Sequence, residues 1–193
     1  MRLDSIKLGN SKISKTCGIF DLPTSVCFHN CAGCYAKKAE RIYPRVRTFR
    51  QRNLDNYNNN PTYWLIQIAR DISQAKNKIK TFRIHSSGDF FSNEYIMHWA
   101  TIVKTFPNIR FYAYTKNQSV LDFTPLTELK NFNLINSITP DGGFNFGKQE
   151  RLDTLVEQGY TICPDTIADN GKGFCMGGCT ICLSNKKVAF KQH

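Results

Sequence analysis

The chain has 193 residues, of which 41% are hydrophobic, and a net charge of +11. This length suits one compact domain, and 14 Phe with 8 Tyr can fill a sizeable core. No stretch approaches the length of a membrane-spanning helix, and the first residues lack the apolar run of a signal peptide. We therefore expect a cytoplasmic protein without a membrane partner.

Apolar residues recur at helical spacing over 64–79, after a run of asparagines at 56–60 that predicts a loop ending at Pro61. A β-rich run at 80–85 follows, and the small residues at 86–89 end it in a turn. Ser92 has the residue type of an N-cap for a helix that Pro107 closes.

The same alternation of strand and helix then continues to residue 163. The predicted segments are a strand at 109–115, a broken helix at 120–130, a strand at 132–139, a turn at 140–143, a helix at 148–158 and a strand at 160–163. This order is typical of βαβ units, and it predicts an α/β fold with a mostly parallel sheet, either open or curled into a partial (β/α) barrel.

Ligands of such folds bind at the carboxyl ends of the strands. That rule selects residues 86–89, 115–116, 137–139 and 163–165 as the edge where a site is expected. From residue 165 the chain is turn-rich and short of periodic segments. We therefore expect a core over 1–163 and a cysteine-rich extension over 164–193 that a metal could hold in place.

All eight cysteines fall into two groups with the same C-x3-C-x2-C spacing. The first group is Cys27, Cys31 and Cys34 with Cys17 upstream, and the second is Cys175, Cys179 and Cys182 with Cys163 upstream. Cytosolic thiols stay reduced, so this usage indicates metal or redox chemistry rather than disulfides. Iron–sulfur clusters are held by several thiolates around a compact core, and the spacing favours them for both groups. Zinc remains the alternative, more so for the second group.

The first cysteine run, near the start of a βα-repeat chain, resembles that of the radical S-adenosylmethionine enzymes. The sequence is also similar, over most of its length, to the phage "gene product 88" family. The segments that carry this second similarity are 20–23, 27–36, 83–92, 112–116 and the cysteine-rich end. A phage-encoded protein would work in the host cytoplasm.

The radical-enzyme resemblance implies a partial or full (β/α) barrel. It also implies that Cys27, Cys31 and Cys34 bind a 4Fe–4S cluster with one iron open for S-adenosylmethionine. Ser87, Gly88 and Asp89 stand where those enzymes keep a Gly-Gly-Glu segment, and Asp89 replaces the glutamate that accepts the cofactor's amino group. Those enzymes often place an aromatic residue before the last cysteine, whereas here Tyr35 follows it. The implied cofactor-binding residues are thus Ser87, Gly88, Asp89 and Tyr35.

The resemblance does not assign Cys17, which is either a fourth ligand of the first cluster or a buried thiol. Cys163, Cys175, Cys179 and Cys182 would form a fully ligated second 4Fe–4S cluster for structure or electron transfer. His85 either faces the ligand site or is a hydrogen-bonded histidine of the sheet.

The net positive charge favours nucleic acid or another acidic partner, and a solvated basic surface is an equally good interpretation. Arginines crowd after the first cysteine group, at Arg41, Arg45, Arg47, Arg50 and Arg52. Three functions follow from the sequence. They are a radical enzyme acting on an unidentified substrate, a non-enzymatic iron–sulfur protein that binds nucleic acid or a host protein, and a twin-zinc binding module.

Overall fold

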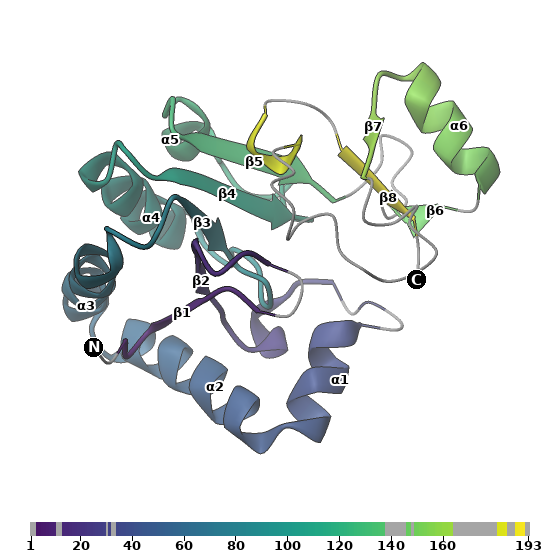
Figure 1. Cartoon of the computed structure of the whole chain (residues 1–193). Helices are drawn as coiled ribbons and strands as arrows, with labels where there is room; N and C mark the ends of the chain where they lie inside the picture. Colours follow the sequence, from purple (N-terminus) through teal and green to yellow (C-terminus); the bar gives the residue numbers. More distant parts are fainter. Residues whose placement is uncertain are drawn as a thin grey trace.

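Five strands form an open, mostly parallel sheet in the order β1–β2–β3–β4–β5 (Figure 1). This computed structural model describes residues 3–10, 13–29, 31, 34–137, 146–147, 149–163, 181–184 and 188–191. The strands are β1 (Ile6–Leu8), β2 (Cys17–Phe20), β3 (Thr81–Ile84), β4 (Arg110–Thr115) and β5 (Phe132–Asn136). Strands β2 to β5 run parallel, and β1 is antiparallel to β2. The predicted α/β class is confirmed, and the sheet is open: these five strands do not close into a barrel.

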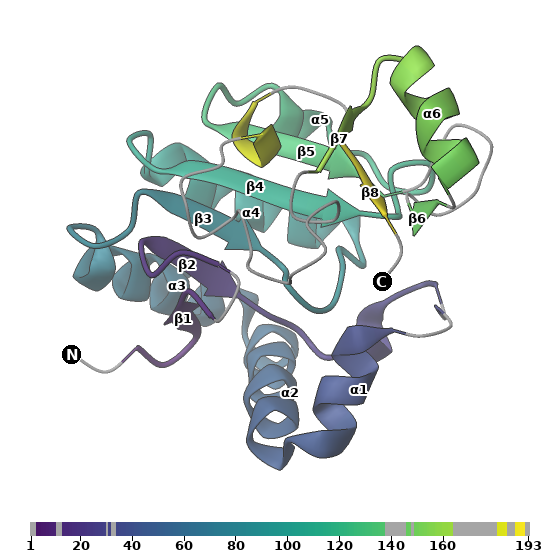
Figure 2. The ribbon, with the colours of Figure 1, turned by 45° about the vertical axis from the view of Figure 1, so that its right-hand side comes forward.

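Helices α3 (Pro61–Ala75) and α4 (Asn93–Thr105) cover one face of this sheet (Figure 2). Their apolar residues pack against the side chains that alternate inward along the strands, as a half-buried sheet requires. Phe20 of β2 lies edge-on to Trp64 of α3 and Trp99 of α4, with ring centroids 5.6 and 5.3 Å apart. All three rings are fully buried, so they form the centre of the core.

Side-chain caps fix where these two helices begin. The Ser92 hydroxyl accepts a hydrogen bond from the Tyr95 amide at 3.1 Å, which confirms the predicted N-cap of α4. The Asn60 side chain accepts one from the Tyr63 amide at 2.9 Å. The predicted loop at 56–60 is wrong, because α2 (Pro44–Asn59) continues through these asparagines and only Asn60 separates it from α3.

A shorter helix, α1 (Tyr35–Ile42), precedes α2, and the two form a hairpin below the sheet (Figure 1). Asn53 of α2 ties this hairpin to the strands, since its amide donates to the Ser5 and Asp21 carbonyls at 3.0 Å each. A single turn, α5 (Thr124–Thr127), connects β4 to β5. None of the helices within the described residues is long and apolar enough to cross a bilayer.

The opposite face of the sheet meets the later part of the chain (Figure 2). There β8 (Val188–Lys191) lies between β6 (Phe146–Gly147) and β7 (Thr161–Ile162), parallel to both, and α6 (Gln149–Glu157) connects β6 to β7. Buried Ile135, Cys163 and Val188 form an apolar cluster with Tyr112 and Tyr114 of β4. The predicted extension therefore contributes a central strand to the second sheet.

His85 is a core residue with an uncommon backbone conformation. Its φ of 65° lies in the left-handed region, and its side chain is 2% exposed. The ring stacks on Tyr95 at an interplanar angle of 14° and shares a 2.9 Å hydrogen bond between Nε2 and the Tyr95 hydroxyl. This placement agrees with the interpretation of His85 as a hydrogen-bonded histidine of the sheet. Burial lowers the pKa of His85 to about 3.

The stability of the fold is expected to decrease as the pH falls below about 6.5, the ordinary pKa of histidine. In this range the unfolded chain binds a proton at His85 that the native chain does not, so His85 can cost at most about 1.4 kcal/mol per pH unit. Urea unfolding of wild type and His85→Asn at pH 7, 6 and 5 measures this slope. Asparagine tolerates positive φ and should flatten the slope, whereas His98→Gln should keep it. An unchanged slope in His85→Asn would contradict the prediction.

Candidate functional site

Three segments meet where β2, β3 and β4 end. They are the chain after β2, which carries Cys27, Cys31 and Cys34, the turn at 86–89 after β3, and residues 115–117 after β4. Parallel strands bring their carboxyl ends to one edge, so the fold places these polar segments side by side as the sequence predicts.

The thiol loop, residues 27–34, brings its described cysteines close to a carboxylate and a cation. Burial raises the pKa of Cys27 to about 12, and the nearby Asp89, Cys34 and Cys31 add to this effect. The Lys116 ammonium lies 2.9 Å from the Cys31 sulfur and donates to it. Cys27 therefore lies within electrostatic range of the other two thiols, of Asp89 and of Lys116.

Two further contacts attach the thiol loop to the strand ends. The His29 ring forms a 3.2 Å hydrogen bond through Nε2 with the Lys116 carbonyl. The Tyr35 hydroxyl donates to the Ser86 carbonyl, while most of the Tyr35 ring is exposed. The loop is thus held by β4 on one side and by the turn after β3 on the other.

Asp89 joins the ends of β3 and β4. Its carboxylate accepts hydrogen bonds from the Phe90 amide at 2.8 Å and from the Lys116 amide at 3.0 Å. Burial raises the pKa of Asp89, while these hydrogen bonds oppose the rise. The carboxylate also accepts a hydrogen bond from the Thr115 side chain. The contact with the Lys116 amide makes Asp89 a positioning residue for Lys116.

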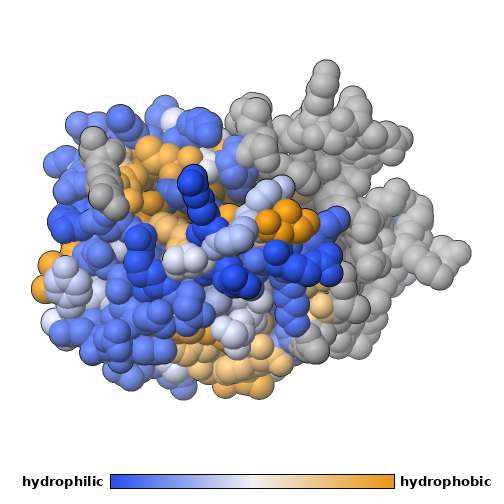
Figure 3. Space-filling view, turned by 90° about the horizontal axis from the view of Figure 1, so that it is seen from below, coloured by the Kyte–Doolittle hydropathy of each residue, from blue (hydrophilic) through white to orange (hydrophobic). Residues whose placement is uncertain are grey.

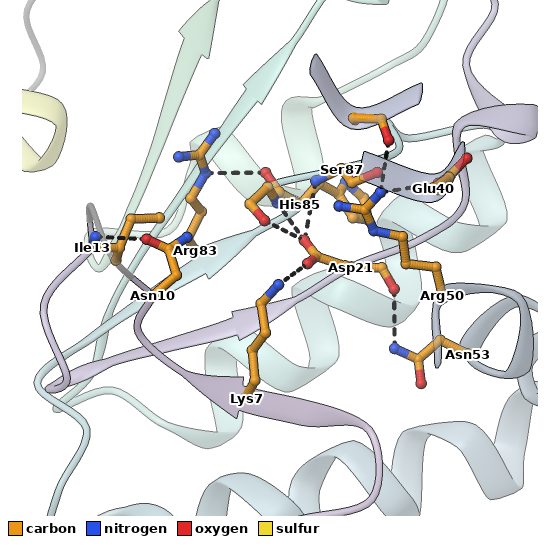
Figure 4. Close-up of polar contacts among 12 residues, drawn as sticks. Lys7, Asn10, Ile13, Asp21, Glu40, Arg50, Asn53, Arg83, His85 and Ser87 are labelled. Atoms are coloured by element: carbon orange, nitrogen blue, oxygen red, sulfur yellow. Dashed lines mark hydrogen bonds and ion pairs between the residues drawn. The ribbon is translucent and has the colours of Figure 1, made fainter. Parts of the chain in front are cut away.

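Asp21, directly after β2, holds the turn at 86–89 in place (Figure 4). Its buried carboxylate accepts from the Ser86 amide and hydroxyl at 2.7 Å each and from the Ser87 amide at 3.0 Å. Lys7 of β1 forms an ion pair with the same carboxylate. One carboxylate therefore organises the turn that supplies three of the four predicted cofactor-binding residues.

The turn is closely packed against the chain after β2. Gly88 has a φ of 83°, and a Cβ there would lie 2.6 Å from the Cβ of Leu22. Leu22 also donates its amide to the Ser87 carbonyl at 3.0 Å. The Ser87 hydroxyl is buried and has no hydrogen-bond partner among the described residues, which leaves one polar group available for a ligand at this edge.

Cys17 lies at the opposite end of β2 from the thiol loop. Its side chain is 2% exposed, packs with Ile13 and Ile19, and reaches the Tyr112 hydroxyl at 3.8 Å. This position favours the interpretation of Cys17 as a buried thiol.

Two cysteines of the second group belong to the apolar cluster around Ile135 and Val188, on the sheet face opposite α3 and α4. Cys163 is buried there, and Cys182, in a short 3-10 helix (Ile181–Leu183), contacts the Tyr114 hydroxyl through its sulfur. The predicted ligands Cys175 and Cys179 lie outside the described residues.

Among the residues that the structure describes, no three His, Cys, Asp or Glu side chains lie close enough to share a single metal ion. In a polynuclear cluster the thiolates bind different irons, so they are spaced more widely than the ligands of one ion. Cys27, Cys31 and Cys34 have the residue type that ligates such a cluster, and Lys116 lies beside Cys31.

Sequence reasoning missed Asp21, Lys7 and Arg83. Arg83, of β3, donates through Nε to the His85 carbonyl at 3.1 Å, and its guanidinium carbon lies 4.8 Å from the Tyr114 ring centroid. The only available signal was local: a charged residue directly after or within an apolar strand must find a partner when it is buried.

The fold and the site define an open-sheet α/β protein with a cysteine-rich loop at the carboxyl edge of its parallel strands. The model of the Gene product 88 family matches residues 5–163, and the chain belongs to this family. It is 27% identical over 195 residues to the Gene 88 protein of Mycobacterium phage D29, covering 87% of this chain and 80% of that protein. The Gene 88 protein of Mycobacterium phage L5 is 26% identical over 197 residues with the same coverage. No solved structure matches the chain.

Proposed function

We propose that this protein binds a 4Fe–4S cluster through Cys27, Cys31 and Cys34. The observation that carries the proposal is the meeting of these thiols with Lys116 at the carboxyl edge of the sheet, where the Lys116 ammonium lies 2.9 Å from the Cys31 sulfur. Thiolate-ligated clusters carry negative charge, and an ammonium group this close would offset part of it.

We further propose that the site works in the manner of the radical S-adenosylmethionine enzymes. Three thiolates leave one iron without a protein ligand. The same edge is bordered by the exposed Tyr35 ring and by the buried Ser87 hydroxyl, which has no hydrogen-bond partner in the described part of the chain. Ser87, Gly88, Asp89 and Tyr35 would bind S-adenosylmethionine there. When bound, the cluster would supply the electron that cleaves this cofactor, and the resulting radical would abstract hydrogen from a substrate.

A second 4Fe–4S cluster at Cys163, Cys175, Cys179 and Cys182 completes the proposal. What supports it is the presence of Cys163 and Cys182 in one apolar cluster with Tyr112 and Tyr114, on the sheet face opposite α3 and α4. Four thiolates would leave no open iron, so the role of this centre would be structure or electron transfer.

Protein purified anaerobically should be brown and contain about eight irons and eight sulfides per chain, the content of two such clusters. The triple variant Cys27→Ala, Cys31→Ala, Cys34→Ala should lose about half of the iron and the corresponding visible absorption. Cys17→Ala is the matched control, because it removes a buried thiol on the other end of β2, and it should keep the full iron content. A folded, colourless protein without iron would overturn the proposal, and stoichiometric zinc would identify the zinc alternative.

Cofactor chemistry needs a separate measurement on the iron-loaded protein. Under reducing conditions it should convert S-adenosylmethionine to 5′-deoxyadenosine, and Asp89→Asn should lower the rate. If the iron-loaded protein neither binds nor cleaves S-adenosylmethionine, the alternative of a non-enzymatic iron–sulfur protein holds instead.

A further inference from the structure

A hollow of about 460 Å³ opens beside the thiol loop, between the start of that loop, α1 and α2. The residues of its lining that matter here are Cys27, Phe28, His29, Lys37, Arg47 and Gln51. Because Cys27 belongs to this lining, the hollow borders the proposed cluster site.

The hollow carries an excess of positive charge. Glu40 is the one acidic residue among the described lining residues. It is neutralised, because its carboxylate accepts from the buried Arg50 guanidinium at 3.1 Å and from the Thr24 amide and hydroxyl at 3.0 and 2.7 Å. Arg50 is thus turned inward, unlike the neighbouring arginines. Arg47 also lines the hollow and forms no ion pair with a carboxylate of the described residues, so it adds positive charge to this lining.

The same charge extends over the hairpin outside the hollow. Exposed cations there are Lys37, Lys38, Arg41, Arg45, Arg47 and Arg52, whereas the exposed acidic residue of these two helices is Asp55. Figure 3 views the molecule from this side, and hydrophilic side chains cover most of the described surface. Lys37 and Arg41 are four residues apart and share one face of α1, which extends the basic surface away from the hollow.

Exposed aromatic rings accompany these cations. Phe28, in the lining, is 56% exposed, and Tyr43, between the two helices, is 58% exposed. Exposed rings beside cations are the combination that binds single-stranded nucleic acid, because bases stack on the rings while phosphates meet the cations. A lone phosphate would use the cations and leave the rings without a role.

We propose that the hollow and the basic face of α1 and α2 bind single-stranded nucleic acid, with phosphates at Lys37 and Arg47 and a base stacked on Phe28. This inference concerns protein side chains alone and does not depend on the proposed cluster. It would place a polynucleotide next to the thiol loop, which makes it the substrate class if the site is catalytic.

The test uses fluorescence anisotropy with labelled 20-nucleotide single-stranded DNA, single-stranded RNA and a DNA duplex, over a salt series, on protein of measured iron content. The double variant Lys37→Gln, Arg47→Gln should bind at least about tenfold more weakly near 0.1 M salt, and the slope of log K against log salt should fall by about 1.4. The matched control Lys104→Gln, Arg110→Gln removes the same charge from exposed positions on α4 and β4 and should bind like wild type.

Phe28→Ala separates stacking from charge. It should weaken single-strand binding at least about fivefold while leaving the salt slope unchanged. The difference between the DNA and RNA arms identifies the preferred strand. Absence of binding, equal loss in both double variants, or equal affinity for the duplex would overturn the proposal. Binding by a protein that holds no iron would support this inference independently of the proposed cluster, whose own test is the iron content of the anaerobically purified protein.

Discussion

Replacing Asp21 with alanine is expected to lower the free energy of unfolding by about 3 kcal/mol, the cost of breaking a buried, hydrogen-bonded charge. The variant would leave the Ser86 and Ser87 amides without their acceptor in a buried turn. It would also leave the Lys7 ammonium without its carboxylate, which costs less because Lys7 is partly exposed. Urea unfolding at pH 7 measures the change.

Two control variants define the cause of this loss. Asp21→Asn keeps one oxygen acceptor for the turn and removes the charge, so it should lose less than the alanine variant. Asp55→Ala removes an exposed carboxylate from α2 and should stay within about 0.5 kcal/mol of wild type. A loss at Asp21 no larger than that at Asp55 would show that the turn does not depend on this carboxylate.

The Asp21 contribution has its own pH range. Burial opposes ionisation, but the Lys7 ion pair and the Ser86 hydrogen bonds outweigh it, so the pKa of Asp21 is lowered from its usual 3.8. The stabilisation is therefore fully present above about pH 4 and is lost as the pH falls through the lowered pKa. The loss at His85 begins near pH 6.5, so the two residues can be separated in one titration.

Gly88→Ala is expected to lower the free energy of unfolding by about 3 kcal/mol, because it combines backbone strain with steric overlap. The φ of 83° is unfavourable for alanine, and the new Cβ would lie 2.6 Å from the Cβ and 3.1 Å from the carbonyl oxygen of Leu22. Leu22 is fully buried, and its amide is hydrogen-bonded to the Ser87 carbonyl, so it has little room to move. The measurement is again urea unfolding, together with the iron content of the anaerobically purified variant.

Gly159→Ala is the control that measures the cost of backbone strain without steric overlap. Its φ is 82°, but an added Cβ would meet no atom of the described residues within 4 Å. It should therefore cost only about 1 kcal/mol, the strain of a left-handed alanine. Equal losses at the two glycines would show that the contact with Leu22 does not matter.

Much of the sheet could be predicted because its strands carry strong local signals. The runs at 80–85 and 109–115 are rich in β-branched and aromatic residues, and Ser92 marks the helix between them. The loop expected at 56–60 was not found because asparagine has only a weak preference against helix, and Tyr57 is buried against Trp64 and Tyr95. Tertiary packing determines that this segment is helical, and a local sequence pattern carries no information about such packing.

The meeting of the thiol loop with residues 86–89 and 115–116 was predictable from the rule that ligands bind at strand ends. The role of Asp21 was not, because its partners Lys7, Ser86 and Ser87 lie 14 to 66 residues away in the sequence. The same holds for Arg50, which stands in a run of arginines and differs from them only in its contact with Glu40.

The order of the second sheet has a consequence for how the chain is made. Strands β6 and β7 each pair with β8, which is the last of the three to leave the ribosome. Until β8 is synthesised, β6 and β7 lack the strand with which each of them pairs. Tyr112 and Tyr114, on the sheet face opposite α3 and α4, likewise lack their packing partner Val188. The three-stranded sheet can therefore form only after translation has passed residue 191, whereas the five-stranded sheet can assemble earlier.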